Sequence, residues 1–203
     1  MQNLFDVELL LQRQLREVAE WHQGSILLKE DLGFQNLVSV QHHTNFELWH
    51  EEDQARDLDA SDSQIAGIKR SIDRLNQKRH DQIEVIDQWL HSRIEQLLVE
   101  VSDCAKLNSE TPGSLIDRLS INALKIFHMD EETRRSNASA AHKKKCSAKL
   151  QILEEQRGDL SVCLRELVSE LETGKKILKI YRQLKMYNDA SLNPVLYHRK
   201  TSP

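Results

Sequence analysis

The sequence contains few residues that interrupt regular structure. Its 203 residues include only 6 Gly and 3 Pro. Because β-sandwiches and β-barrels need many Gly- and Pro-rich turns, this scarcity argues against both architectures. Aromatic residues make up only 5% of the chain, whereas Leu, Glu, Gln, Lys and Arg, which favour helices, are abundant. The composition therefore predicts an all-α protein, an elongated helical bundle of about five to six helices, mostly antiparallel.

Long apolar segments are also lacking. No run of about 18 apolar residues occurs, so we expect no transmembrane helix. The N-terminus lacks the basic start and apolar centre of a signal peptide. The three cysteines, Cys104, Cys146 and Cys163, form no CxxC pair, and the last two would lie about 25 Å apart on one helix, beyond disulfide reach. Reduced thiols and a cytoplasmic location are therefore expected.

An excess of positive charge is lacking: 28 Lys and Arg stand against 32 Asp and Glu, and the net charge of −4 argues against a general nucleic-acid binder. The charge is unevenly distributed: residues 47–62 are acidic and residues 175–200 are basic. One interpretation is solvated helix faces. The other is that the basic segment meets an anionic ligand, an acidic partner or the acidic segment of the same chain.

Apolar residues at spacings of three and four predict the helices. The expected helices cover about residues 4–22, 34–56, 61–101 and 111–132, followed by a fifth that carries Cys146 to Leu171. Gly174 is a candidate C-cap, although Ile177, Leu178, Tyr181 and Leu184 suggest that helix continues beyond it. We expect one helical-bundle domain over residues 1–189 and an irregular tail over residues 190–203.

Polar residues occupy positions that a plain core would fill with apolar ones. On one face of the second helix lie Val38, His42, Asn45, Trp49, Asp53 and Arg56; on the third lie Lys69, Asp73, Asn76 and His80, with Arg79 inside the apolar stripe. A short link makes these helices antiparallel neighbours. The sequence thus predicts His42 and Asn45 opposite Asp73 and Asn76, and Asp53 opposite Lys69.

This polar layer has two competing interpretations, with a partner interface as a third. It is either a satisfied hydrogen-bond network that sets the helix register, or the lining of a ligand pocket. The candidate ligand-binding residues are His42, Asn45, Trp49, His50, Asp53, Arg56, Lys69, Asp73, Asn76 and Arg79.

Arg, Lys and Asn side chains suit phosphate and hydroxyl groups. We therefore expect a binding or accessory protein for a small anionic ligand, a sugar phosphate or a nucleotide sugar. An enzyme that depends on a metal, or that uses His50 or His42 with a carboxylate as acid and base, is one alternative. A structural interaction protein is another. The sequence identifies no cofactor and no catalytic residue, and it leaves oligomerisation open.

Metal ligands have weaker support. Glu47-Leu48-Trp49-His50 has the Glu-x-x-His spacing of di-iron bundles, but the second such motif that those sites need is missing. His142 and Cys146, at positions i and i+4, form half of a zinc site, and His128 lies at their level if the fourth and fifth helices form a hairpin. Packing or surface roles explain these residues equally, so no metal site is predicted, with Glu47, His50, His128, His142 and Cys146 as the weak candidates.

Several of these blocks resemble a known family. Asn45 to Asp53 with Ala55-Arg56, and Lys69 to Arg79, are similar to signatures of the bacterial domain of unknown function 4254 family, and residues 111–119, 124–129, 185–189 and 192–194 resemble its later blocks. His80 departs from the Asn expected there. The resemblance spans about residues 35–197. It implies a helical bacterial protein of unassigned activity that is associated with cell-surface glycan assembly. Other proteins of glycan assembly would then be its partners.

Overall fold

The computed structural model describes residues 3–26, 28, 33–182, 186 and 189–197. Its long helices are α1 Val7–His22, α2 Phe34–Gln54, α3 Asp62–Gln96, α4 Pro112–Arg134 and α5 Ala140–Glu172. The short elements are β1 Lys106–Leu107, β2 Lys176–Ile177 and α6 Pro194–Tyr197. The predicted all-α helical bundle is confirmed.

Side-chain caps begin four of the five long helices, all but α2. The Ser61 hydroxyl accepts from Gln64 N–H while the Gln64 side chain accepts from Ser61 N–H, which completes the capping box expected there. The Thr111 hydroxyl accepts from Ser114 N–H, and Pro112 stands in the first turn, where no N–H is required. Local sequence therefore sets where α3 and α4 start.

Two helix ends differ from the prediction. α3 stops at Gln96 instead of reaching Val101, and Leu98 adopts a positive φ of 51°. α5 ends at Glu172, and helix does not resume at Ile177: Gly174 has φ +65°, and the chain enters β2, which pairs in parallel with β1. A Cβ on Gly174 would lie 1.9 Å from the Glu100 carbonyl oxygen, so the segment after α3 packs directly on this glycine.

The expected C-terminal tail lies only partly within the described residues. Pro194–Tyr197 form α6, where an irregular chain was expected. Leu184, residues 187–188 next to the expected domain boundary, and residues 198–203 lie outside the described ranges.

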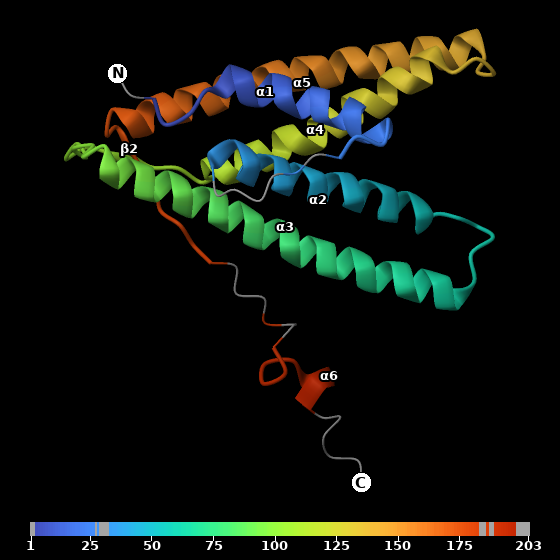
Figure 1. The fold of residues 1–203 in the computed structure, drawn as a ribbon, viewed down its shortest axis with the longest axis horizontal. Helices are drawn as coiled ribbons and strands as arrows, with labels where there is room; N and C mark the ends of the chain where they lie inside the picture. The colour runs from blue at the N-terminus through green and yellow to red at the C-terminus, as the bar shows by residue number, and fades with distance from the viewer. Residues whose placement is uncertain (1–2, 27, 29–32, 183–185, 187–188, 198–203) are drawn as a thin grey trace.

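The bundle consists of two helical hairpins. α2 packs on α3, α4 packs on α5, and α1 lies against α4, α2 and α5 (Figure 1). The hairpins are close together at the end that carries β1 and β2 and diverge toward their turns (Figure 1). The largest apolar cluster joins all five helices, with Leu10, Ile86, Leu90, Ile116, Leu119 and Leu164 almost fully buried. Its burial holds the hairpins together.

A smaller apolar cluster lies farther along α1, α2 and α4. Val18, Ala123 and Leu124 are buried there, and the partly buried rings of Phe46, Trp49 and Phe127 pack against them. The polar residues of α2 continue beyond this cluster toward the turn. Of the helices in the described ranges, none combines the length and the apolar character that crossing a bilayer requires.

Candidate functional site

A pocket of about 490 Å³ lies between α2, α3 and α4. Its lining comprises Asn45, Leu48, Trp49, Glu52, Asp53, Arg56, Asn76, Arg79, Ile121 and Leu124. Six of the ten residues predicted as ligand contacts are among them: Asn45, Trp49, Asp53, Arg56, Asn76 and Arg79. The divergence of the two hairpins places this space beside the polar face of α2.

One buried carboxylate, Asp117 of α4, organises the floor of the pocket. Its Oδ1 accepts from Gln41 Nε2 (2.7 Å), Asn45 Nδ2 (3.0 Å) and Arg79 Nε (2.8 Å). Its Oδ2 accepts from Arg79 Nη2 (2.5 Å). This two-bond contact is the strong geometry for an arginine–carboxylate pair, and it raises the pKa of Arg79. Asp117 thus ties α2 and α3 to α4 and orients two side chains that line the pocket.

A second set of hydrogen bonds runs behind the floor. His42 Nε2–H donates to the Gln14 carbonyl (2.9 Å), so its Nδ1 accepts from the Ser120 hydroxyl (2.6 Å). Ser120 Oγ in turn accepts from Asn45 Nδ2 (2.8 Å). Burial, with a smaller contribution from the nearby Arg157 charge, lowers the pKa of His42 to about 3. His42 is fully buried with both ring nitrogens hydrogen-bonded, and it supports Asn45 from behind the residues that line the pocket.

The outer part of the pocket carries charges of both signs. Arg56 Nη1 donates to Glu52 Oε2 (2.9 Å), and both side chains are largely solvent-exposed. Asp53 is exposed beside them. With Arg79 neutralised by Asp117, the lining offers donors and acceptors rather than a strongly positive field.

The predicted pairing of α2 with α3 is wrong in detail. His42 and Asn45 bind Ser120 and Asp117 on α4, not Asp73 and Asn76. Lys69 pairs with Asp73 on the solvent face of α3, where both are more than half exposed, and not with Asp53. The reason is that the buried face of α2 packs against α1 and α4 as well as α3. Of the candidate residues on α3, Asn76 and Arg79 line the pocket.

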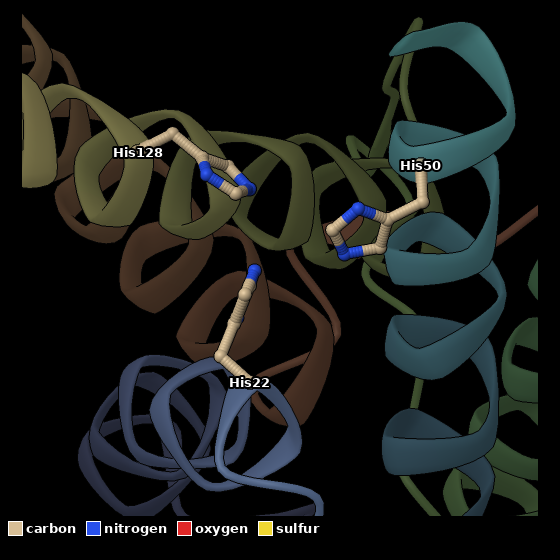
Figure 2. Close-up of side chains that lie close together, drawn as sticks. All are labelled: His22, His50 and His128. Carbon is tan, nitrogen blue, oxygen red and sulfur yellow. The ribbon is translucent and has the colours of Figure 1, made fainter. Parts of the chain in front are cut away.

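Three histidines from three helices meet next to the pocket. His22 ends α1, His50 lies on α2 and His128 lies on α4, and Figure 2 shows their rings directed toward one common space. One ring nitrogen from each lies within 4.8 Å of the other two. Burial lowers the pKa values of His50 and His128, and the neighbouring His22 ring lowers them further.

Aromatic rings hold these histidines in place. Phe127 stacks on His22 with ring centroids 4.2 Å apart, and Trp49 stacks on His128 at 4.6 Å with an interplanar angle of 9°. Phe46 contacts His50 edge-on at 4.5 Å. Trp49 also lines the pocket, so the histidine cluster and the pocket share a wall.

The other weak metal candidates separate into different places. Glu47 pairs with Lys78 (3.4 Å) and His43 (3.7 Å), so it does not act with His50 as a Glu-x-x-His ligand pair. His128 lies with His22 and His50 rather than with His142 and Cys146.

His142 instead joins Glu132 and Cys146 in a second group. Its Nε2 is 2.8 Å from Glu132 Oε2 and 3.3 Å from Cys146 Sγ. These are also possible metal ligands by type and spacing. However, the Glu132 carboxylate only accepts, so His142 Nε2 carries the proton that it donates and offers no lone pair in this arrangement.

Sequence reasoning missed Asp117, Ser120 and His22. One face of α4 carries residues at spacings of 4, 3, 4 and 3: Gly113, Asp117, Ser120, Leu124 and Phe127. Asp117 and Ser120 are the two polar members of this stripe, and both are buried. That pattern was available in the sequence. His22 carries no comparable signal, because each helix contributes only one histidine to the cluster.

Comparison with known proteins identifies a family and no characterised relative. Searches of curated proteins and of solved structures found no match. The model of the family described as "Protein of unknown function (DUF4254)" matches residues 35–180, which include α2 to α5 and the whole pocket. The matched region covers well over half of the chain and agrees with the resemblance carried by Asn45 to Asp53 and Lys69 to Arg79. The chain therefore belongs to the DUF4254 family.

Proposed function

We propose that this protein binds a small sugar-derived ligand, a sugar phosphate or a nucleotide sugar, in the pocket between α2, α3 and α4. The observation that carries the proposal is the lining itself: a Trp ring, two Asn and two Arg side chains are among the residues around a space of about 490 Å³. A pocket of this size falls within the range that small-molecule sites occupy in proteins.

The inner residues suit hydroxyl groups. Both N–H groups of the Asn45 amide are used by Asp117 and Ser120, so this side chain offers a ligand its oxygen as an acceptor. Arg79 uses two of its roughly five N–H donors on Asp117, which leaves others for a ligand. Trp49 supplies a flat apolar surface against which a sugar ring can pack.

Arg56 suits the anionic group of such a ligand. Its side chain is 69% exposed, and its partner Glu52 is 47% exposed. A surface pair of this kind contributes little to stability, so a phosphate can replace Glu52 at low cost and gain charge-assisted hydrogen bonds. Glu52 and Asp53 disfavour a ligand with many negative charges and accept hydrogen bonds from hydroxyl groups.

A bacterial, cytoplasmic accessory role in cell-surface glycan assembly belongs to the same proposal. It rests on the family resemblance and on a ligand class that glycan assembly uses. The cysteines Cys104, Cys146 and Cys163 are free thiols, which fits a reducing compartment.

Thermal unfolding in the presence of ligands tests the proposal. Free hexoses, hexose phosphates and nucleotide sugars are compared, and one at 100 times its Kd stabilises the fold by about 2.7 kcal/mol. Arg56→Ala and Asn76→Ala are each expected to weaken the binding of the phosphorylated ligand by roughly 10-fold or more. Arg74→Ala, an exposed arginine of α3 outside the pocket, is the matched control. Equal binding by Arg56→Ala, Asn76→Ala and wild type would reject this pocket as the site.

A further inference from the structure

The histidine cluster beside the pocket has the composition of a metal site. His22, His50 and His128 come from α1, α2 and α4, so the tertiary fold alone brings them together (Figure 2). Ring centroids are 4.9 to 6.0 Å apart. Imidazole suits zinc, copper, iron and nickel, and three histidines with an open fourth position form a recognised zinc arrangement.

Hydrogen bonds at Nδ1 fix which nitrogen carries the proton in two of the three rings. His22 Nδ1 lies 2.7 Å from the Val18 carbonyl, which only accepts, so Nδ1 carries the proton. His128 Nδ1 lies 3.0 Å from Glu131 Oε2 and donates to this carboxylate in the same way. Both rings therefore present Nε2 as an unprotonated lone pair.

These lone pairs lack the partner that burial demands. His22 Nε2 and His128 Nε2 are buried, and neither has a hydrogen-bond partner among the residues that the structure describes. Buried acceptors of this kind are rare because they have lost water and gained nothing. A cation between the rings would supply the missing interaction.

The surroundings match those of metal-bound histidines. A ligating histidine usually donates its other N–H to a carboxylate or a backbone carbonyl, which fixes the ring and strengthens it as a ligand. Glu131 does this for His128, and the Val18 carbonyl does it for His22. The Glu131 carboxylate also acts electrostatically on His50, as does that of Asp53, so negative charge lies close to the cluster.

We propose that His22, His50 and His128 bind one divalent transition-metal ion, with Zn²⁺ as the best fit, through Nε2 of His22 and Nε2 of His128. Nitrogen ligands of a tetrahedral zinc ion lie roughly 3.3 Å apart, given Zn–N bonds of about 2.0 Å. The ligand atoms lie within 4.8 Å of one another, so each pair must close by at most about 1.5 Å to reach that separation. The fourth position is left for water or a ligand. This proposal stands independently of the sugar-binding proposal.

The group formed by Glu132, His142 and Cys146 is the competing metal site. Its His142 Nε2 donates to Glu132, whereas the three-histidine cluster has two buried nitrogens with no partner among the described residues. The presence of a thiolate makes the two sites distinguishable by spectroscopy.

Titration of the full-length, chelator-treated protein with Zn²⁺ and with Co²⁺ tests the proposal. We expect one equivalent of tight binding and a Co²⁺ spectrum of nitrogen and oxygen ligation without a thiolate charge-transfer band. His50→Ala, at the half-buried member of the cluster, is expected to weaken Zn²⁺ binding by at least roughly 100-fold. Glu131→Gln, at an exposed residue that leaves the fold intact, is expected to weaken it by about 10-fold or more.

Two control variants complete the design. His91→Ala removes an exposed histidine of α3 that pairs with Glu95, and Cys146→Ser removes the thiol of the competing group; both are expected to bind Zn²⁺ as wild type does. Failure of the wild-type protein to bind either ion overturns the proposal. A thiolate band that disappears in Cys146→Ser, or unchanged Zn²⁺ affinity in His50→Ala and Glu131→Gln, overturns it as well.

Discussion

Replacement of Asp117 by Asn tests whether one carboxylate holds the pocket floor together. The side chain is only 6% exposed and accepts from Gln41, from Asn45 and from Nε and Nη2 of Arg79. Asparagine has nearly the same shape but no charge, and it turns one oxygen into a donor. The variant therefore leaves Arg79 partly buried without its counter-ion and places a donor against other donors.

The expected loss follows from the burial of the pair. Removing one partner of a buried ion pair costs about 3–5 kcal/mol. The Arg79 side chain is 23% exposed, so solvent offsets part of this cost, and we expect about 3 kcal/mol. For a protein of this size, that loss lowers Tm by roughly 6–12 °C.

Urea unfolding at pH 7, followed by the helical circular dichroism signal, measures the loss. Asp73→Asn is the matched control, because Asp73 is 60% exposed and pairs with exposed Lys69; its effect is expected to stay within about 0.5 kcal/mol. The double variant Asp117→Asn/Arg79→Gln should lose less than the sum of its two single variants. A change below about 1 kcal/mol for Asp117→Asn would refute this account of the pocket floor.

Two further perturbations probe buried groups of the fold. The pKa of His42 is about 3 in the folded protein and ordinarily 6.5, so the unfolded state binds protons first as the pH falls. The stability advantage of wild type over His42→Gln is therefore fully present above pH 6.5. It should shrink by about 1.4 kcal/mol per pH unit between pH 6 and 4. An advantage that is constant across this range, measured by urea unfolding, would contradict a buried neutral His42. Gly174→Ala should lower the free energy of unfolding by more than about 1 kcal/mol, because φ is +65° and the new Cβ would overlap the Glu100 carbonyl. Gly67→Ala, in open space on α3, should raise Tm. Equal Tm values for these two variants would show that the contact at Gly174 carries no strain.

Local features of the sequence were sufficient for the helices and their starts. The spacing of apolar residues and the caps at Ser61 and Thr111 act within a few residues, so they are readable without knowledge of the fold. The continuation of helix past Gly174 was wrong, because contact with Glu100, distant in sequence, decides the conformation there. In this chain, α3 and α4 start at local caps, whereas the conformation after α5 depends on a contact distant in sequence.

The sequence by itself determined the helical class, the family likeness and the unusual polarity of α2. Asn45 and Asp53 were identifiable from periodicity alone as polar residues on the predicted core face of the second helix. Only the tertiary structure decided their partners: α4 supplies Asp117 to Asn45, and α1 supplies His22 to the histidine cluster. The physical reason is that periodicity reports which face of a helix is buried. It does not report which neighbouring helix covers that face or at what height.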